Sequence, residues 1–399
     1  MRDILFLAHR LPWPPDRGDK IRSYNFIKYL STLARVHVLA FAEDVQEIAS
    51  KDALQSLTAS LHVEWRSNIP GPSVLKALLM HQPASVSMFS SRSMQGHVNR
   101  LLEQEDIGTI LAYSGQMAQF VPERTSARFI MDFVDVDSEK YVAYSDTGPL
   151  LLRWLYRREA RLLGRFERAV ASRADRALFV SEAEATLFRH LSGLGSDRVV
   201  AVENGIDLEH FRADSGFRRL DSSARGAGAL LVFTGQMNYR PNIDAVTDFA
   251  RKMLPVLRHV RPDVRFAIVG RNPSPEVEKL AELPGVIVTG EVPDVRPWLA
   301  AADVVVAPLK IARGIQNKVL EAMAMGRPVV VSSAAAEGID ALPDRDFIVA
   351  DGDAIASAIL ALLADPERTA KLGRRARARM EERYRWDVCL TQLEALLAP

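Results

Sequence analysis

The chain has 399 residues, of which 48% are apolar and 25% are charged, and its formal net charge is +1. This composition is typical of soluble globular proteins, and the length predicts two domains rather than one compact core. The small net charge excludes a global attraction to nucleic acid or to an acidic membrane, so any such attraction must come from a local patch. The only cysteine is Cys389, which excludes an intrachain disulfide and fits a reducing cytoplasm.

The sequence begins with MRDILFLAHRLPWPP. Its apolar run is too short for a signal peptide and predicts an opening β-strand instead. No apolar stretch approaches the ~18 residues that a membrane-spanning helix needs. We therefore expect a cytoplasmic protein, one that can still touch the inner face of the membrane.

Short β-branched runs alternate with amphipathic helices along the whole chain, which predicts parallel sheets with helical crossovers. In the first half the predicted strands are 3–8, 36–42, 109–114, 128–133, 176–181 and 199–204, and the predicted helices are 19–33, 94–104, 150–173 and 182–192. In the second half the predicted strands are 229–235, 264–270, 286–292, 303–309, 328–333 and 346–350. The expected fold class is α/β, with two Rossmann-like domains.

Residues 206–228 separate the two series. They are polar, rich in glycine and serine, and lack apolar periodicity, which predicts an interdomain linker. The predicted first domain is therefore 1–205 and the predicted second domain is 229–384. In open α/β sheets ligands bind outside the carboxyl ends of the strands, so we expect both domains to direct those ends into one cleft.

The stretch GIQNKVLEAMAMGRPVV follows the predicted strand 303–309 and predicts a helix whose N-terminus lies at the carboxyl end of the sheet. Free N–H groups at such an end favour an anion. Gly314 lets the backbone approach a phosphate, Asn317 can donate a hydrogen bond and Lys318 adds a positive charge. Glu321 lies on the same helical face and is suited to accept hydrogen bonds from ribose hydroxyls. The alternative is a Lys–Glu pair on a solvated face.

In three further segments the predicted strand ends at or next to a glycine. FTGQMNYRPNIDAV ends its strand at Gly235 and carries Arg240 in the loop that follows. FAIVGRNPSPEV ends its strand at Gly270, and VENGIDLEHF ends the last strand of the first domain at Asn204 and Gly205. Together these segments are a more specific signal of function than any one of them alone.

The order of LPWPPDRGDKIRSYNFIKYL, VENGIDLEHF, FTGQMNYRPNIDAV, GIQNKVLEAMAMGRPVV and the closing RYRWD resembles the GT-B glycosyltransferases of family 4, the group 1 glycosyl transferases. The resemblance covers essentially the whole chain. HRLPWPPDRGDKIRS is most similar to the sugar transferases associated with PEP-CTERM exopolysaccharide systems. The resemblance implies a GT-B fold in which the C-terminal helix, 385–399, packs back on the first domain.

The resemblance also implies an activity. A nucleotide-diphosphate sugar of the UDP or GDP type would bind to the second domain, and a lipid-linked or polysaccharide acceptor to the first. The family retains anomeric configuration and usually needs no metal, so we expect no cofactor and no nucleic-acid partner. Glu321 matches the glutamate that binds the donor ribose, Gly18 the glycine that approaches the diphosphate, and the stretch from Gly290 to Val292 the strand end that contacts the base.

Two departures from the family pattern affect the sugar contacts. Members often have a glutamate eight residues before the position of Glu321, where this chain has Arg313. Many also have arginine and lysine around the loop after the first strand of the second domain, where this chain has Gln236 and, nearby, Arg240. We therefore expect Arg240, Lys318 and Arg313 to bind the diphosphate jointly, and we assign catalysis to Arg240, Lys318 and Glu321.

Some residues of the first domain have two interpretations. Asp135 and Asp137 have the Asp-x-Asp spacing of metal-dependent transferases, but the two-domain order argues against a metal there. We expect Asp132 or Asp135 to position the acceptor; the alternative is a helix cap or a loop salt bridge. His9 would contact the acceptor or make one structural hydrogen bond, and Arg22 would reach an anionic acceptor.

The segment 151–177 combines apolar residues, among them Leu151, Leu155, Leu162 and Phe166, with arginines that include Arg153, Arg157, Arg158, Arg161 and Arg165, and it predicts a basic amphipathic helix. Such a helix on the acceptor domain could rest on an anionic membrane surface or meet a lipid diphosphate. The alternative is a solvated helix whose apolar stripe packs on the sheet.

Two other functions remain open from the sequence. Non-hydrolysing nucleotide-sugar epimerases share the GT-B architecture and need no acceptor. A non-catalytic nucleotide-sugar-binding subunit of a synthase complex would fit Arg313 in place of the common glutamate.

Overall fold

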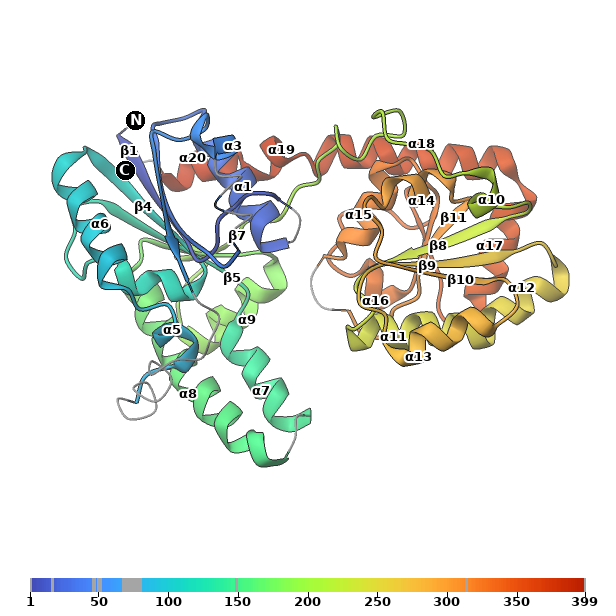
Figure 1. Cartoon of the computed structure of the whole chain (residues 1–399), viewed down its shortest axis with the longest axis horizontal. Coiled ribbons are helices and arrows are strands. Elements are labelled where there is room, and N and C mark those ends of the chain that lie inside the picture. Colours follow the sequence, from blue (N-terminus) through green and yellow to red (C-terminus); the bar gives the residue numbers. More distant parts are fainter. Residues whose placement is uncertain are drawn as a thin grey trace. The chain divides into compact units, whose positions relative to one another are not determined.

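The computed structural model of the chain describes residues 2–15, 18–44, 48, 52–66, 81–147, 150–312 and 315–397. The chain divides into two compact units, Met1–Asn204 with Leu390–Pro399, and Gly205–Cys389. Each unit contains one parallel sheet with helices packed against it (Figure 1), which confirms the predicted α/β class with two Rossmann-like domains. None of the helices in the described ranges is both long and apolar enough to cross a membrane.

The first unit contains a seven-stranded sheet in the order β3-β2-β1-β4-β5-β6-β7, and all its strand pairs are parallel. The central strands are continuous apolar runs because helices cover both of their faces. The strands are β1 (Asp3–Ala8), β2 (Val36–Ala42), β3 (Ser60–Trp65), β4 (Ile107–Tyr113), β5 (Arg128–Val134), β6 (Arg176–Phe179) and β7 (Val199–Ala201).

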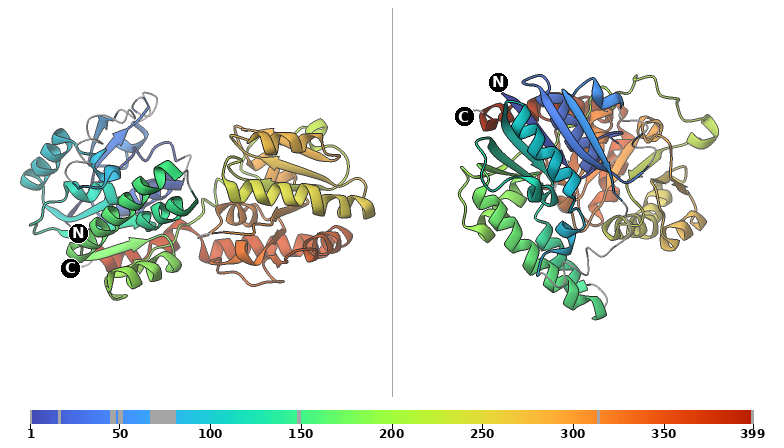
Figure 2. Two further views of the ribbon diagram at one scale, coloured as in Figure 1. Left: turned by 90° about the horizontal axis from the view of Figure 1, so that it is seen from below. Right: turned by 60° about the vertical axis from the view of Figure 1, so that its left-hand side comes forward.

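The helices of the first unit are α1 (Gly18–Leu30), α3 (Asp52–Gln55), α5 (Ala84–Ser87), α6 (Arg92–Gln104), the 3₁₀ helix η1 (Gly115–Phe120), α7 (Asp137–Thr147), α8 (Leu150–Arg173), α9 (Glu182–Ser192) and α20 (Gln392–Leu397). Helices α7 and α8 lie side by side (Figures 1 and 2). The C-terminal helix α20 contacts α1, where the hydroxyl of Tyr29 donates to Oε1 of Glu394 at 2.7 Å. The second unit is therefore inserted between two segments of the first.

The second unit contains a six-stranded parallel sheet in the order β10-β9-β8-β11-β12-β13. Its strands are β8 (Leu230–Thr234), β9 (Arg265–Val269), β10 (Val286–Gly290), β11 (Val304–Ala307), β12 (Val329–Val331) and β13 (Ile348–Val349). Strand order reverses between β8 and β11, so the carboxyl ends of these two strands flank a topological switch point, where open α/β sheets bind ligands.

The helices of the second unit are α10 (Ser222–Arg225), α11 (Arg240–Asp248), the π-helical turn η2 (Phe249–Met253), α12 (Leu254–Val260), α13 (Pro275–Glu278), the 3₁₀ helix η3 (Lys279–Glu282), α14 (Arg296–Ala301), α15 (Asn317–Ala324), α16 (Ser333–Ala336), α17 (Ala354–Ala364), α18 (Pro366–Arg383) and α19 (Trp386–Leu390). Helix α19 ends at the residue where the chain returns to the first unit.

Residues 206–228, which we predicted to be a linker, lie within the second unit instead. Ile206 and Leu208 are buried in its core, and the backbone N–H of Ile206 donates to the carbonyl of Tyr384 at 2.6 Å. Ile206 and Leu208 are only two positions apart, but apolar residues are too few along 206–228 to produce a sustained periodic pattern. The chain also returns to the first unit at Leu390 rather than at residue 385.

Several elements of the first unit were not predicted, namely the short helices α3, α5 and η1, strand β3 and helix α7. Strand β3 is an edge strand whose residues are only half-buried, so it lacks the continuous apolar run of its neighbours. Helix α7 has a polar sequence, DSEKYVAYSDT, without a clear apolar stripe. At the start of α9, Oγ of the N-cap residue Ser181 accepts a hydrogen bond from the N–H of Glu184 at 3.2 Å.

Candidate functional site

Helix α15 begins at the carboxyl edge of the second sheet. Strand β11 ends at Ala307, the chain continues through Leu309, which is buried, and the helix starts at Asn317 with Gln316 as its N-cap. The inner face of α15 is apolar, with Val319, Leu320, Ala322, Met323 and Ala324 buried. This face fixes the helix on the sheet, so the free N–H groups of its first turn lie at the edge where ligands are expected.

Lys318 is half-buried in the first turn of α15. Its Nζ donates to Oδ1 of Asn242 at 2.6 Å and lies 4.4 Å from the centroid of the Phe233 ring. Burial lowers the pKa of Lys318 to about 8, and the attraction of Glu321 opposes that shift. The ammonium is therefore held in place, but it is less well solvated than a surface lysine and gains from an anionic partner.

Glu321 lies one turn further along α15 and is also half-buried. No described residue forms a hydrogen bond or an ion pair with its carboxylate. Burial raises the pKa of Glu321 to about 7, against the opposing attraction of Lys318. A carboxylate without a protein partner at the edge of a sheet is available to accept hydrogen bonds from a ligand.

Three of the predicted donor-binding glycines form a continuous backbone strip across β8, β9 and β10. The N–H of Gly270 donates to the carbonyl of Gly290 at 3.2 Å, and the N–H of Gly235 donates to the carbonyl of Val269 at 3.0 Å. A Cβ atom on Gly270 would lie 1.7 Å from the carbonyl oxygen of Gly235. A Cβ on Gly235 would lie 3.2 Å from Nζ of Lys318. The glycines thus allow these strand ends and the ammonium to approach one another.

Three other predicted donor residues lie around this edge. Arg240 is the first residue of α11, and its exposed guanidinium pairs with Asp244 at 2.6 Å and with Glu276 at 3.4 Å. Asn317 is exposed in the first turn of α15, and Val292 packs against the core just after β10. Arg313 and Gly314 lie outside the described residues.

In the first unit, Arg22 and Asp132 bind each other. Nε of Arg22 donates to Oδ2 of Asp132 at 2.9 Å, and Nη1 donates to the carbonyl of Val202 at 2.7 Å and to Oδ1 of Asn204 at 2.8 Å. Both charged side chains are fully buried. Burial raises the pKa of Asp132, although Arg22 opposes the shift. We expected these residues to face an acceptor; the structure instead makes them an internal ion pair that joins α1, β5 and the end of the first segment.

His9 follows β1 directly and is 8% exposed. Its ring stacks on Tyr113 with centroids 5.7 Å apart, its Nε2 lies 3.4 Å from Oδ2 of Asp19, and its Nδ1 is buried with no hydrogen-bond partner among the described residues. Arg10 donates to the same carboxylate at 2.8 Å. Burial opposes ionisation of Asp19, but His9 and Arg10 outweigh it and hold the pKa of that carboxyl well below its usual range. Gly18, exposed at the start of α1, is adjacent to this cluster in sequence.

The Asp-x-Asp pair has a cationic partner from the protein. Nζ of Lys140 lies 2.9 Å from Oδ2 of Asp135 and 2.8 Å from Oδ1 of Asp137. The two aspartates raise the pKa of Lys140, against the effect of its burial. The ammonium occupies the place that a divalent ion would take between these carboxylates. Asp135 is thus in the loop salt bridge that we had considered as the alternative to acceptor binding.

One other cluster has metal-ligating side chains within reach of each other, among the residues that the structure describes. Donor atoms of Asp3, His37 and Glu105 lie within 4.8 Å of one another. The guanidinium of Arg35 already pairs with Asp3 at 3.0 Å and with Glu105 at 3.6 Å. Because a cation is built into the cluster, its residues are a poor fit for a metal ion.

Sequence reasoning missed Asn242 as a site residue. Its Nδ2 donates to the carbonyl of Gln236 at 2.9 Å, and its Oδ1 accepts from Lys318. Asn242 thereby connects the loop after β8 to the first turn of α15. The two residues are 76 positions apart in sequence, so no local pattern could have paired them.

A comparison with protein families supports this reading of the second unit. Residues 228–365 match the family described as Glycosyl transferases group 1. The match covers β8 to α17 and includes Gly235, Gly270 and α15.

Two similar curated proteins are named as mannosyltransferases of phosphatidylinositol lipids. The chain is 30% identical over 235 residues to a phosphatidyl-myo-inositol mannosyltransferase of Propionibacterium freudenreichii subsp. shermanii, covering 57% of each protein. It is 29% identical over 250 residues to a GDP-mannose-dependent alpha-(1-6)-phosphatidylinositol monomannoside mannosyltransferase of Mycolicibacterium smegmatis, covering 58% of this chain and 64% of that one. The aligned region spans less than two thirds of either relative.

Solved structures share the fold over the whole chain. Anabaena Alr3699/HepE in complex with UDP matches with a TM-score of 0.66 at 17% identity, covering 99% of both chains. WaaG, a glycosyltransferase involved in lipopolysaccharide biosynthesis, matches with a TM-score of 0.64 at 14% identity, covering 99% of this chain and 100% of that one. The chain therefore has the two-domain GT-B fold of these glycosyltransferases, and its residues 228–365 match the family described as Glycosyl transferases group 1.

Proposed function

We propose that this protein is a retaining, metal-independent glycosyltransferase that moves a sugar from a nucleotide-diphosphate donor to a lipid-linked or polysaccharide acceptor. The observation that carries the proposal is the first half of α15: a half-buried ammonium beside a half-buried carboxylate that has no hydrogen-bond or ion-pair partner among the described residues. Both groups have pKa values shifted toward their neutral forms. Such an arrangement lowers the stability of the free protein, and the contacts of a bound ligand offset that loss.

The proposed donor site uses three kinds of group. Lys318 and the N–H groups of the first turn of α15 bind the diphosphate, because both offer positive charge, and among the described residues Glu321 is the carboxylate that attracts Lys318. Glu321 accepts hydrogen bonds from the ribose hydroxyls. The strip of Gly235, Gly270 and Gly290 lets the nucleotide approach the backbone, since these three positions have no side chain of their own.

The chemistry follows from charge. Breaking the bond between the sugar and the phosphate places negative charge on the departing diphosphate, and stabilising that charge lowers the barrier. Lys318, the N-terminus of α15 and Arg240 can supply this stabilisation without a divalent ion. The acceptor hydroxyl then attacks from the face that the diphosphate leaves, so the anomeric configuration is retained. The Lys140 ammonium between Asp135 and Asp137 supports a site without metal.

The names of similar proteins support the substrate classes. The mannosyltransferase of Mycolicibacterium smegmatis is named for GDP-mannose and for a phosphatidylinositol acceptor, and a HepE structure holds UDP. We therefore propose a UDP or GDP sugar as donor and a lipid-linked glycan as acceptor, within cytoplasmic exopolysaccharide assembly. His9, which lies at the carboxyl end of β1, is our candidate for an acceptor contact.

We further propose that the first unit touches the inner face of the membrane through 151–177. One side of α8 packs on the sheet, with Leu163 and Val170 buried. At the N-terminal end of α8, Leu152 is 42% exposed and Trp154 is 68% exposed, and arginines lie next to them in the sequence. Exposed tryptophan and leucine next to basic side chains suit an anionic membrane surface.

The first test is thermal stabilisation of the purified protein by UDP, GDP, ADP and CMP, with and without magnesium. A ligand that binds only the native state raises its stability in proportion to the logarithm of its concentration over Kd, so a micromolar site gives a clear shift at millimolar ligand. We expect a shift with UDP or GDP that does not depend on magnesium. A shift that appears only with magnesium would contradict metal independence, and none with any nucleotide would contradict the donor site.

The second test follows the products. The protein is incubated with UDP-glucose and with GDP-mannose in the presence and absence of a lipid-linked acceptor. A transferase releases the nucleotide diphosphate faster with the acceptor present, and the rate of this release falls in a Glu321→Ala variant. An isomerised sugar nucleotide formed without acceptor would show an epimerase instead, and donor binding without any turnover would show a binding subunit.

A further inference from the structure

The second unit contains a cavity of about 670 Å³ at the amino-terminal edge of its sheet. Its walls come from the residues just before β11 and β12, from the C-terminal end of α15, and from α17 and α18. The glycine strip and the first turn of α15 lie at the opposite, carboxyl edge of the same parallel sheet. The volume is in the range that holds a small organic molecule, about 300 to 1,000 Å³.

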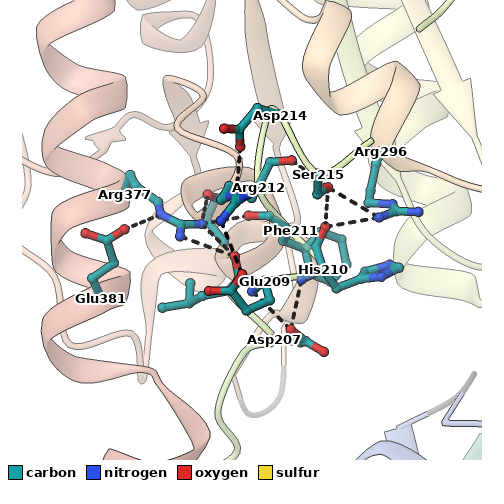
Figure 3. A network of polar contacts seen from close by, with 12 residues as sticks. Asp207, Glu209, His210, Phe211, Arg212, Asp214, Ser215, Arg296, Arg377 and Glu381 are labelled. Atoms are coloured by element: carbon teal, nitrogen blue, oxygen red, sulfur yellow. Dashed lines mark hydrogen bonds and ion pairs between the residues drawn. The ribbon is translucent and has the colours of Figure 1, made fainter. Parts of the chain in front are cut away.

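One wall of the cavity is fixed by a polar network that holds the segment 207–215 (Figure 3). Nη1 of Arg377 donates to the carbonyls of Phe211 and Ala324, each at 2.7 Å, and its Nε donates to Oε1 of Glu381 at 2.6 Å. Nε of Arg212 donates to Oδ1 of Asp214 at 2.6 Å. The carboxylates of Asp214 and Glu381 therefore already have cationic partners within the wall.

Two guanidinium groups on the cavity have hydrogen-bond donors to spare. Nη1 of Arg327 donates to the carbonyl of Ala302 at 3.3 Å, but its Nε is buried and has no partner among the described residues. Arg374 is exposed on α18 and forms no hydrogen bond or ion pair with any residue that the structure describes. Asp303 attracts Arg327, but Oδ2 of Asp303 is bound by Arg225 at 2.9 Å and by the N–H of Leu230 at 2.7 Å.

The rest of the lining is largely apolar. Leu363 and Pro366 contribute to it, and they offer a ligand the contact area that a purely ionic site would lack. Met325 and Leu362 also line the cavity but are almost fully buried. An oxyanion is the partner that two guanidinium groups favour, because each can bind two of its oxygens at once. The combination fits a molecule that has a charged head and a short apolar body.

We propose that this cavity binds a small amphipathic oxyanion, a carboxylate or phosphate on a short aliphatic chain, with its head held by Arg327 and Arg374 and its chain against Leu363 and Pro366. This site is separate from the proposed donor site and does not depend on it. The measurement below distinguishes the two head groups, because carboxylate and phosphate can each offer a guanidinium a pair of acceptor oxygens.

The test is calorimetric titration of the full chain with hexanoate, with hexyl phosphate and with hexanol. We expect one site for the anions, with the tighter of the two identifying the head group, and binding of hexanol weaker by about tenfold or more. Arg374→Ala should weaken anion binding about tenfold. Arg368→Ala is the matched control, since Arg368 is exposed on the same helix and lies outside the cavity.

Two further variants separate this site from its alternatives. Ala370→Trp fills the cavity from an exposed position on α18 and should abolish anion binding while thermal unfolding remains cooperative. Lys318→Met should leave hexanoate binding unchanged. The proposal is overturned if neither anion binds at millimolar concentration, if Arg374→Ala and Ala370→Trp bind as the wild type does, or if Lys318→Met removes the binding.

Discussion

Two pairs of opposite charges, one in each unit, have opposite surroundings. Arg22 and Asp132 are fully buried, and the guanidinium is bound by a carboxylate, a carbonyl and an amide oxygen. Lys318 and Glu321 are half-buried at a sheet edge, and Glu321 has no bonded partner among the described residues. The first pair completes its own hydrogen bonds and contributes to the fold; the second pair leaves them incomplete and is suited to a ligand.

The largest expected effect comes from breaking the first pair. Arg22→Met leaves the carboxylate of Asp132 buried without its partner, and we expect the free energy of unfolding to fall by about 3 to 5 kcal/mol. Urea unfolding measures this loss. The double variant Arg22→Met with Asp132→Leu should recover most of it, because no charge remains buried. A single variant as stable as the wild type would remove the distinction between the two pairs.

Removing the ammonium of the second pair should affect binding rather than folding. We expect Lys318→Met to weaken UDP or GDP binding about tenfold to hundredfold, the cost of a lost charged hydrogen bond in a half-buried site. The free protein should be as stable as the wild type or more so, because burial disfavours the charged form of this lysine. Lys252→Met, at an exposed position on η2, is the control. Nucleotide binding that survives Lys318→Met would contradict the site.

Removing the charge of Glu321 should stabilise the free protein at high pH. The pKa of Glu321 is raised from 4.5 to about 7, so its ionised form is less favourable in the folded than in the unfolded state. Relative to Glu321→Gln, the wild type loses stability as the pH rises from about 4.5 to about 7. We expect the variant to be more stable by on the order of 1 kcal/mol at pH 8 and equal below pH 4.5, by urea unfolding. A wild type that is more stable than the variant at pH 8 would contradict this prediction.

The smallest expected effect is at a third group of charges, a lysine between two aspartates. Lys140 bridges Asp135 and Asp137 with side chains that are one quarter to one half exposed. Solvent screens such contacts, so Lys140→Ala should change the free energy of unfolding by less than about 1 kcal/mol. The same variant frees both carboxylates, and titration with Mn²⁺ should then show weak binding that the wild type lacks. Equal Mn²⁺ binding by both proteins would show that the lysine does not block a metal.

The sequence predicted most of the fold because buried parallel strands are continuous apolar runs. β1 and β2 were predicted residue for residue, and α8 and α9 likewise. Prediction failed where burial depends on distant partners. β3 lies at an edge, and Ile206 and Leu208 are single apolar residues whose burial requires the returning chain near Tyr384.

For the candidate site, the sequence predicted which residues lie at the sheet edge, but it did not predict which side chains bind each other. A glycine or a helix start directly after an apolar run must lie at the carboxyl edge of a parallel sheet, which located Gly235, Gly270 and α15. Whether a charged side chain there faces inward depends on elements far away in sequence. Arg22 looked available by its place near the first strand end, yet Asp132, 110 residues later, binds it inside the unit.

The contact between β8 and β9 limits which mutations the chain can accept. Position 270 has no room for even one methyl group, since it would overlap the carbonyl of Gly235. In a library of all single substitutions selected for folded protein, position 270 should therefore retain only glycine. Position 290 has open space and a φ of +68°, so it should also accept asparagine and aspartate, which tolerate that conformation. Neighbouring positions of one backbone strip would thus differ sharply in how far they can drift during evolution.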